Sequence, residues 1–322
     1  MLCKNLAILA IRQVVGSDHF SHIGVSSCVT DNRVFYSNRS APAMYPLYLY
    51  PDDEAETLFD DTATSPWPPD SEHGDRVPNL SKVFVEVMEE KLGMEFVPHP
   101  HPGDAAGPHP LAVSQRETAV APQRDAPPPP FPSHGEGEAF SPRHVLAYAY
   151  AVFHSPTYRQ RYAEFLKIDF PRLPLTSDRD LFWRLVEKGE ALMALHLMES
   201  PLLERTSVRF PKGDSNLVAS RHPRYLAPGE PHPETGEPLA EGRVYINETQ
   251  YFAGIDPQVW KFEIGGYQVL EKWLRDRKRA DYPLSFDDVR HYQRIVVALE
   301  ETMRLMEEID ALIDAHGGWP IM

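Results

Sequence analysis

The sequence contains little cysteine and no long apolar run. Two of its 322 residues are cysteines, Cys3 and Cys28, too few for a disulfide framework or a four-thiolate zinc site. No stretch of about eighteen consecutive apolar residues occurs, which excludes a transmembrane helix. No small-residue cleavage site follows the short apolar run at residues 6–11, which argues against a secretory signal. These absences indicate a protein of the reducing cytoplasm with no membrane partner.

The sequence also lacks the short motifs of common catalytic sites. Neither type of glycine-rich phosphate loop occurs, nor do the nucleophile elbow of hydrolases and the paired histidines of zinc proteases. Adenine-modifying enzymes carry an Asp/Asn/Ser-Pro-Pro-aromatic loop. The nearest string, Ser155-Pro156-Thr157-Tyr158, lacks the second proline and has the form of a helix start. We therefore expect no catalysis by this chain alone, and no metal or cofactor bound to it.

Negative charge is concentrated in two segments of the chain. The formal net charge is −15 at pH 7. Residues 51–75 contain nine acidic residues and no lysine or arginine, and residues 300–314 contain six acidic residues against Arg304. Basic stretches lie elsewhere, at residues 142–172, 205–224 and 272–279. The net charge therefore neither requires nor excludes a DNA-binding face.

Proline divides the chain into parts. It accounts for 32 of the 322 residues, about twice its usual share. Twelve of these prolines lie between Pro98 and Pro142, in a segment with few large apolar residues. We expect residues 98–140 to be a flexible, disordered insertion. It separates a β-rich N-terminal part, residues 1–97 with an acidic loop at 51–77, from a helical and mixed remainder, residues 141–322.

Local patterns predict both helices and strands. The predicted strands cover residues 5–15, 19–29, 33–36, 45–50, 243–247 and 259–264. The predicted helices cover residues 81–92, 145–154, 157–167, 177–197 and 267–277. Ser285 starts a long final helix that runs to about Ala315, with Gly317 as its stop signal. The sequence thus predicts an α+β fold with a long C-terminal helix and without βαβ alternation.

Several longer motifs occur in order along the chain. They are YPLYLYP at residues 45–51, HSPTYR at 154–159, FLKIDFPR at 165–172, YINETQYF at 245–252 and IGGYQVLEKWL at 264–274. In this order they resemble the C-terminal specificity region of Type ISP restriction–modification enzymes, a family that includes adenine-specific DNA methyltransferases with a helicase part. The resemblance covers nearly the whole chain apart from the acidic loop and the proline-rich insertion.

The resemblance implies a DNA target-recognition domain in a phage-defence system. In such enzymes a nuclease, an ATP-driven translocase and an N6-adenine methyltransferase precede this region. The implied partners are double-stranded DNA and that methyltransferase–helicase–nuclease portion, in cis or in trans; the parent system would use S-adenosylmethionine, ATP and Mg²⁺. An alternative is a protein-interaction or scaffolding module that docks the methyltransferase–helicase subunit. A more remote alternative is a methyltransferase remnant.

Two groups of cations are candidate contacts to DNA phosphates. The first group lies on the helical motif and consists of Arg159, Arg161 and Lys167. The second consists of Lys272, Arg275, Arg277 and Lys278, which together with Arg279 form the densest basic cluster in the chain. Phosphate contacts of this kind add affinity and register without reading sequence. The alternative for both groups is a solvated helix face.

Three polar residues within YINETQYF are candidates for reading bases. Asn247 and Gln250 are of the residue types that pair bidentately with adenine, and Thr249 lies between them. The alternative is that these residues form a turn after a strand.

Overall fold

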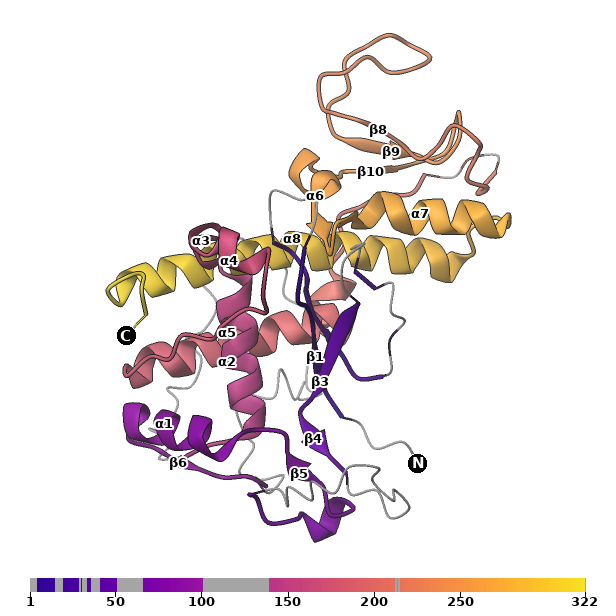
Figure 1. Ribbon diagram of the computed structural model, residues 1–322. Helices are drawn as coiled ribbons and strands as arrows, with labels where there is room; N and C mark the ends of the chain where they lie inside the picture. The colour runs from indigo at the N-terminus through magenta and orange to yellow at the C-terminus, as the bar shows by residue number, and fades with distance from the viewer. Residues whose placement is uncertain are drawn as a thin grey trace, which may run out of the picture.

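The structure is a computed structural model that describes residues 5–14, 20–28, 30, 34–35, 41–50, 66–100, 139–211, 213 and 215–321. Within these residues the chain combines helices with small sheets, which confirms the predicted α+β class (Figure 1). Most of the predicted disordered insertion, most of the acidic loop and part of the predicted strand at 33–36 lie outside the described residues.

A three-stranded antiparallel sheet forms the N-terminal part. Its strands are β1 (Ala7–Ile11), β2 (Ile23–Ser26) and β3 (Pro42–Pro46), with β1 in the centre. Ile8 lies opposite Val25 on one side and Tyr45 on the other. Successive residues Leu9, Ala10 and Ile11 are all buried, so both faces of the central strand are covered.

Two pairs of short strands flank the first helix. β4 (Tyr48–Leu49) pairs with β5 (Val77–Pro78), and the 3₁₀ helix η1 (Ser71–His73) lies between them. Helix α1 (Lys82–Leu92) starts at Ser81, whose hydroxyl accepts a hydrogen bond from Phe84 N, and it ends at Gly93 in the left-handed region. β6 (Glu95–Phe96) then pairs in parallel with β7 (Ala139–Phe140). This pair places residues 95–96 beside residues 139–140.

Two crossing helices form the centre of the first apolar core. They are α2 (Pro142–His154) and α5 (Arg179–His196). Gly189 permits their close approach, because a Cβ atom there would overlap the carbonyl oxygen of Ala147. Side chains from the N-terminal sheet and α1 pack against the same helices. Residues of both predicted parts, 1–97 and 141–322, therefore share one core.

A second apolar core lies beyond the 3₁₀ helix η2 (Pro201–Glu204). Its sheet has the order β10-β9-β8, with β8 (Arg224–Leu226), β9 (Arg243–Tyr245) and β10 (Tyr251–Ala253). The remaining elements of this lobe are α6 (Pro257–Lys261), the hairpin β11 (Glu263–Ile264) and β12 (Tyr267–Gln268), and α7 (Val269–Ala280). Val244 and Phe252 point from the sheet into the core with Leu270 and Leu274 of α7.

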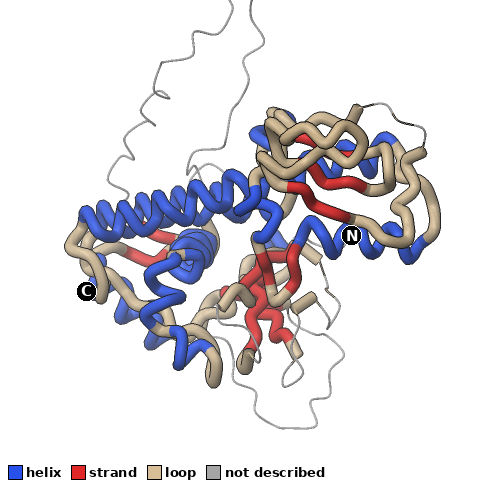
Figure 2. The backbone as a smooth tube through the Cα atoms, turned by 90° about the horizontal axis from the view of Figure 1, so that it is seen from above, coloured by secondary structure: helices blue, strands red, loops and turns tan. Residues whose placement is uncertain are grey.

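Helix α8 (Phe286–Ala315) connects the two cores. Ser285 starts it with a capping box to Asp288, as the sequence predicts. Tyr292 and Val296 in its first half belong to the second core, whereas Ile309 and Ile313 in its last half belong to the first. Its thirty residues span about 45 Å. Figures 1 and 2 show this helix running along the molecule from the α7 side to the α3 side.

Several predicted elements differ in the structure. Val34 and Phe35, the described residues of the strand predicted over 33–36, form a bend, and the strand predicted over 45–50 is divided between the end of β3 and β4. The helix predicted over 157–167 is two short helices, α3 (Pro156–Arg161) and α4 (Ala163–Leu166), separated at Tyr162. The strand predicted over 259–264 is wrong for most of its length, because residues Pro257–Lys261 form α6. Asp256 caps that helix by accepting a hydrogen bond from Gln258 N, and Pro257 occupies its first position.

Candidate nucleic-acid interface

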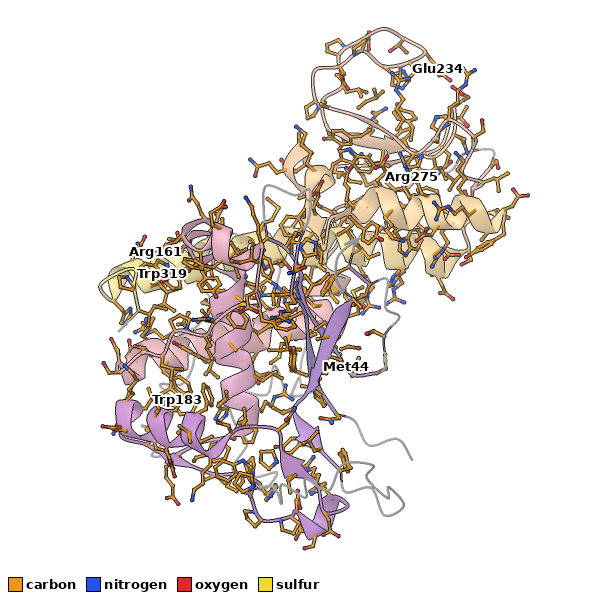
Figure 3. All side chains as sticks on the ribbon, viewed as in Figure 1. Met44, Arg161, Trp183, Glu234, Arg275 and Trp319 are labelled. Atoms are coloured by element: carbon orange, nitrogen blue, oxygen red, sulfur yellow. The ribbon has the colours of Figure 1, made fainter. Side chains whose placement is uncertain are left out.

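The two groups of candidate phosphate contacts lie far apart. The first group, called the α3 group, consists of Arg159 and Arg161 on α3 and Lys167 at the end of α4; Thr157 at the start of α3 bonds to Asp310 near the end of α8. In the second, the α7 group, Arg277 pairs with Asp288 near the start of α8. These two positions are 22 residues apart along one helix, which corresponds to about 33 Å. Figure 3 shows Arg161 and Arg275 correspondingly well separated. A duplex would need about ten base pairs to reach from one group to the other.

The HSPTYR motif fixes the start of α3 against α8. The carboxylate of Asp310 accepts hydrogen bonds from the backbone N of Thr157 (2.9 Å), from its hydroxyl (2.7 Å) and from the hydroxyl of Ser155. A carboxylate at a helix N-terminus is stabilised by the unpaired N–H groups there. The Ser-Pro-Thr part of the motif therefore performs a structural task and leaves no donors for DNA.

The three cations of the α3 group are in different environments. Arg159 is turned into the protein, where its Nε donates to the carbonyl oxygen of Phe153 at 2.7 Å, and burial lowers its pKa to about 10. Lys167 forms an exposed ion pair with Glu164 at 2.9 Å. Arg161 is exposed on the last turn of α3. Arg161 is therefore the member of this group that faces solvent most freely.

The cations of α7 are held by neighbouring side chains. Lys272 pairs with Asp276 (2.6 Å) and Arg275 pairs with Glu271 (2.7 Å), each one helical turn away. The side chain of Arg275 is 61% exposed, and exposed pairs of this kind contribute little stability. Arg275 can therefore exchange Glu271 for a phosphate at small cost.

Two further cations of α7 hold the lobe together. Arg277 pairs with Asp288 at 3.1 Å and stacks over the ring of Trp273, and its side chain is 29% exposed. Lys278 donates to the carbonyl oxygens of Ser220 and His222. These contacts join α7 to α8 and to the segment before β8, so both side chains have structural partners.

The polar residues of YINETQYF form the turn between β9 and β10. Asn247 Nδ2 donates to the carbonyl oxygens of Ser215 (2.7 Å) and Leu217 (3.2 Å), while its Oδ1 accepts from the backbone N of Gln250 (2.8 Å). Gln250 is 1% exposed, and its Nε2 donates to the carbonyl oxygen of Pro211. Thr249 is exposed at the tip of the turn. The amide groups of Asn247 and Gln250 are thus engaged within the protein.

Residues 215–224 join the polar turn to α7. Asn247 holds the beginning of this segment, Lys278 holds its middle, and the backbone N of Ala219 donates to Ile246 O at 2.8 Å. Arg221 and Arg224 are exposed on the same segment. One sequence signal points to this surface, the net charge of +4 over residues 205–224, but no individual residue within that stretch was a candidate. The structure places the α7 cations, the turn and these two arginines on one lobe.

A buried polar cluster lies between α2, α5 and α8. Nδ1 of His196 accepts from the Tyr150 hydroxyl at 2.6 Å, and its Nε2 lies 2.9 Å from the Thr302 hydroxyl. Burial lowers the pKa of His196 to about 4, and burial also lowers the pKa of His154 well below its usual value. Both rings are therefore neutral near pH 7. Within the described residues no group of three or more His, Cys, Asp or Glu side chains is placed to hold a metal ion.

The chain belongs to the family of Type ISP C-terminal specificity domains, whose family model matches residues 1–308. None of the described helices has the length and hydropathy that a membrane span requires. A comparison with curated protein sequences gives no match.

Solved structures of larger enzymes have a similar fold. The ATP-dependent Type ISP restriction–modification enzyme LlaBIII bound to DNA matches 95% of this chain with 16% identity and a TM-score of 0.52. The DrdV–DNA complex matches 95% with 17% identity and a TM-score of 0.55. A nuclease-deletion mutant of the Type ISP enzyme LlaGI, in complex with a DNA substrate mimic, matches 95% with 16% identity and a TM-score of 0.50. The matched regions are 16%, 24% and 21% of those chains, so this chain corresponds to a fraction of each enzyme.

Proposed function

We propose that this chain is the DNA target-recognition module of a Type ISP-like restriction–modification system. In this role it positions an N6-adenine methyltransferase and a nuclease on their site. The match to the specificity-domain family over residues 1–308 carries the proposal. The similarity of its fold to parts of Type ISP enzymes that were solved with DNA supports it.

In this proposal the chain contributes recognition and not chemistry. S-adenosylmethionine, ATP and Mg²⁺ would serve the methyltransferase–helicase–nuclease portion, present in cis or in trans. We therefore expect the purified chain to transfer no methyl group to duplex DNA when it is supplied with S-adenosylmethionine. Incorporation of a labelled methyl group into adenine would contradict this part of the proposal.

Phosphate contacts are assigned first to Arg275 and Arg161, because their guanidinium groups are exposed. Lys272 and Lys167 take the same role by exchanging an exposed ion pair for a phosphate. Among the base-reading candidates Thr249 is exposed at the tip of the turn, and its hydroxyl, which donates to Asn247 Oδ1 over 3.4 Å, can exchange this long hydrogen bond for one to a base.

Salt dependence of duplex binding tests the proposal. Each phosphate contact releases counterions, so the logarithm of the binding constant falls linearly with the logarithm of the salt concentration. We expect fluorescence anisotropy to detect duplex binding with such a slope, and Arg275→Ala to reduce the slope by about one unit. Binding that is absent at low salt would contradict a DNA-recognition role.

Arg184→Ala is the matched control. Arg184 also forms an exposed pair with an acid one turn away, Asp180 at 2.8 Å, but it lies on α5 in the other core. This variant should keep the wild-type slope. Equal reductions of the salt slope in both variants would show that Arg275 contributes only to the overall charge of the chain and does not contact a phosphate.

The alternative, a protein-docking module, is favoured by one specific observation. Phe165 and Ile168 are 69% and 63% exposed, and Tyr45 is exposed as well. Exposed apolar side chains that gather in a patch mark sites of protein interaction. In this alternative, Phe165→Ser would disrupt assembly with the catalytic portion, while DNA binding by the chain alone would be weak and insensitive to Arg275→Ala.

A further inference from the structure

Arg224 lies on the same lobe as the polar turn, and it is better placed to read DNA bases than the side chains of the turn are. Arg224 is the first residue of β8, which is an edge strand of the β10-β9-β8 sheet. It is exposed, and among the residues that the structure describes its guanidinium has no hydrogen-bond or ion-pair partner. Its five N–H donors are therefore available to a ligand.

The strand register places Arg224 on the outer face of the sheet. Arg224 lies opposite Tyr245, which in turn lies opposite Tyr251. Residues in register across a sheet point to the same face. The next residue, Tyr225, points inward, where its ring stacks on Trp260 at 5.4 Å and its hydroxyl donates to Ile255 O at 3.0 Å. These contacts of Tyr225 fix the orientation of β8.

Aromatic and apolar side chains are packed together on the outer face beside Arg224. The rings of Tyr245 and Tyr251 lie 5.0 Å apart, and the guanidinium of Arg243 stacks over Tyr251 at 4.4 Å. Leu226 and Leu239 close the other end of this cluster. A reading side chain needs such support, because specificity depends on a fixed geometry between donor and base.

Charge defines which end of this face approaches DNA. His222, on the segment that leads into β8, has Arg224, Lys278 and Glu248 as its charged neighbours, and Lys278 of α7 donates to the carbonyl oxygen of Ser220 on the same segment. The loop that joins β8 to β9 is acidic and contains Glu230, Glu234, Glu237 and Glu241. Figure 3 shows Glu234 far from α7 and Arg275. Phosphates are therefore attracted to the Arg224 end of the sheet and repelled by the loop.

We propose that Arg224 reads a guanine in the target sequence, with the exposed beginning of β8 at the major groove. This inference rests on the proposed recognition function. In the major groove, an arginine fork that pairs with guanine O6 and N7 is the commonest specific contact. Phosphate contacts by the α7 cations would fix the register.

Selection of duplexes from a random pool tests the inference. The full chain, its Arg224→Ala and Arg224→Lys variants, and the control Arg172→Ala are each used for selection. We expect the wild-type consensus to contain a G·C pair that becomes degenerate with Arg224→Ala. Affinity for the wild-type consensus should fall roughly 5- to 150-fold, whereas affinity for unrelated duplexes should change little. Arg172 is exposed and is the last residue of FLKIDFPR, beside the other core, and its replacement should leave the consensus intact.

The lysine variant separates base reading from phosphate binding. Lysine keeps the charge but not the fork, so Arg224→Lys should retain nonspecific binding and lose the preference for G·C. An unchanged consensus in Arg224→Ala would overturn the inference while leaving the recognition function in place. The inference would also be overturned if Arg224→Ala lost affinity equally for all duplexes and Arg224→Lys restored that affinity. A wild-type chain that selects no sequence would overturn the recognition function itself.

Discussion

At the scale of single residues, His196 has the environment that most affects stability. Its Nδ1 accepts from the Tyr150 hydroxyl, and the Thr302 hydroxyl donates to Ala298 O at 2.7 Å. The Thr302 oxygen is therefore free to accept from the Nε2–H of His196. These hydrogen bonds stabilise the neutral imidazole of His196. Protonation would convert Nδ1 from an acceptor into a second N–H donor, which would face the Tyr150 hydroxyl.

We expect the free energy of unfolding to decrease as the pH falls from 7 to 5. The pKa of His196 is about 4 in the folded chain and about 6.5 in the unfolded chain. Between these values the unfolded state binds more protons, so stability is present above pH 6.5 and is lost as the pH decreases. The loss from this residue is about 2 kcal/mol at pH 5, measured by urea unfolding across the pH series.

His196→Gln should make this pH dependence shallower. Part of it should remain, because the pKa of the buried His154 is lowered as well. His232→Gln, on the β8–β9 loop, serves as the control and should keep the wild-type steepness. Stability that increases toward pH 5 in the wild type would be incompatible with a neutral buried His196.

At the scale of elements, the beginning of α3 depends on one side chain of α8. Asp310 accepts from the Ser155 hydroxyl and from two donors of Thr157. Asp310→Asn replaces one accepting oxygen by a donor of similar size, which leaves a partly buried donor unpaired. We expect a loss of about 1–3 kcal/mol in the free energy of unfolding. Asp314→Asn, one turn further on an exposed part of α8, should change stability by less than about 0.5 kcal/mol.

The sequence predicts the first residues of helices well, because helix capping depends on residues that are close together in the chain. Ser81, Ser141 and Ser285 each bond to a backbone N–H three residues further on, so the signal and its effect lie within one turn. The strand predicted over 259–264 fails because the local start signal Asp256-Pro257 outweighs the β-propensity of the residues after it. Most helices therefore follow from the sequence, with boundaries shifted by a few residues.

Side-chain roles in the candidate site depend on distant partners and do not follow from residue type. Arg159 is turned inward by a carbonyl at the end of α2, and Gln250 by a carbonyl 39 residues away. Asn247 stabilises the turn between β9 and β10, which is the alternative that the sequence left open for it. Arg224 lies in none of the sequence motifs. Its side chain is accessible because the strand register places it on the outer face of the sheet. These properties arise only when the lobe is assembled.

At the scale of the whole molecule, α8 makes the two cores interdependent. Its first half packs in the second core and its last half in the first. Loss of either core would expose apolar side chains on a helix that the other core needs. We therefore expect the two cores to unfold together.

Tryptophan fluorescence can report on each core separately. Trp67, Trp183 and Trp319 pack against the first core, whereas Trp260 and Trp273 pack against the second. A chain with Trp260 and Trp273 changed to Phe reports on the first core, and a chain with the other three changed reports on the second. In each chain the fluorescence transition should coincide with the loss of helical circular dichroism. A fluorescence transition that clearly precedes helix loss in either chain would show that the cores unfold independently.

The parallel pairing of β6 with β7 has a consequence for protein engineering. Phe96 lies opposite Phe140, with ring centroids 5.3 Å apart, so the chain leaves the core and returns to it at one place. Foreign domains are best accepted where the two points of attachment lie close together on a folded body. We therefore expect that a fluorescent protein attached between β6 and β7 would give a tagged specificity module whose opposite lobe, with α7 and β8, is left unaltered.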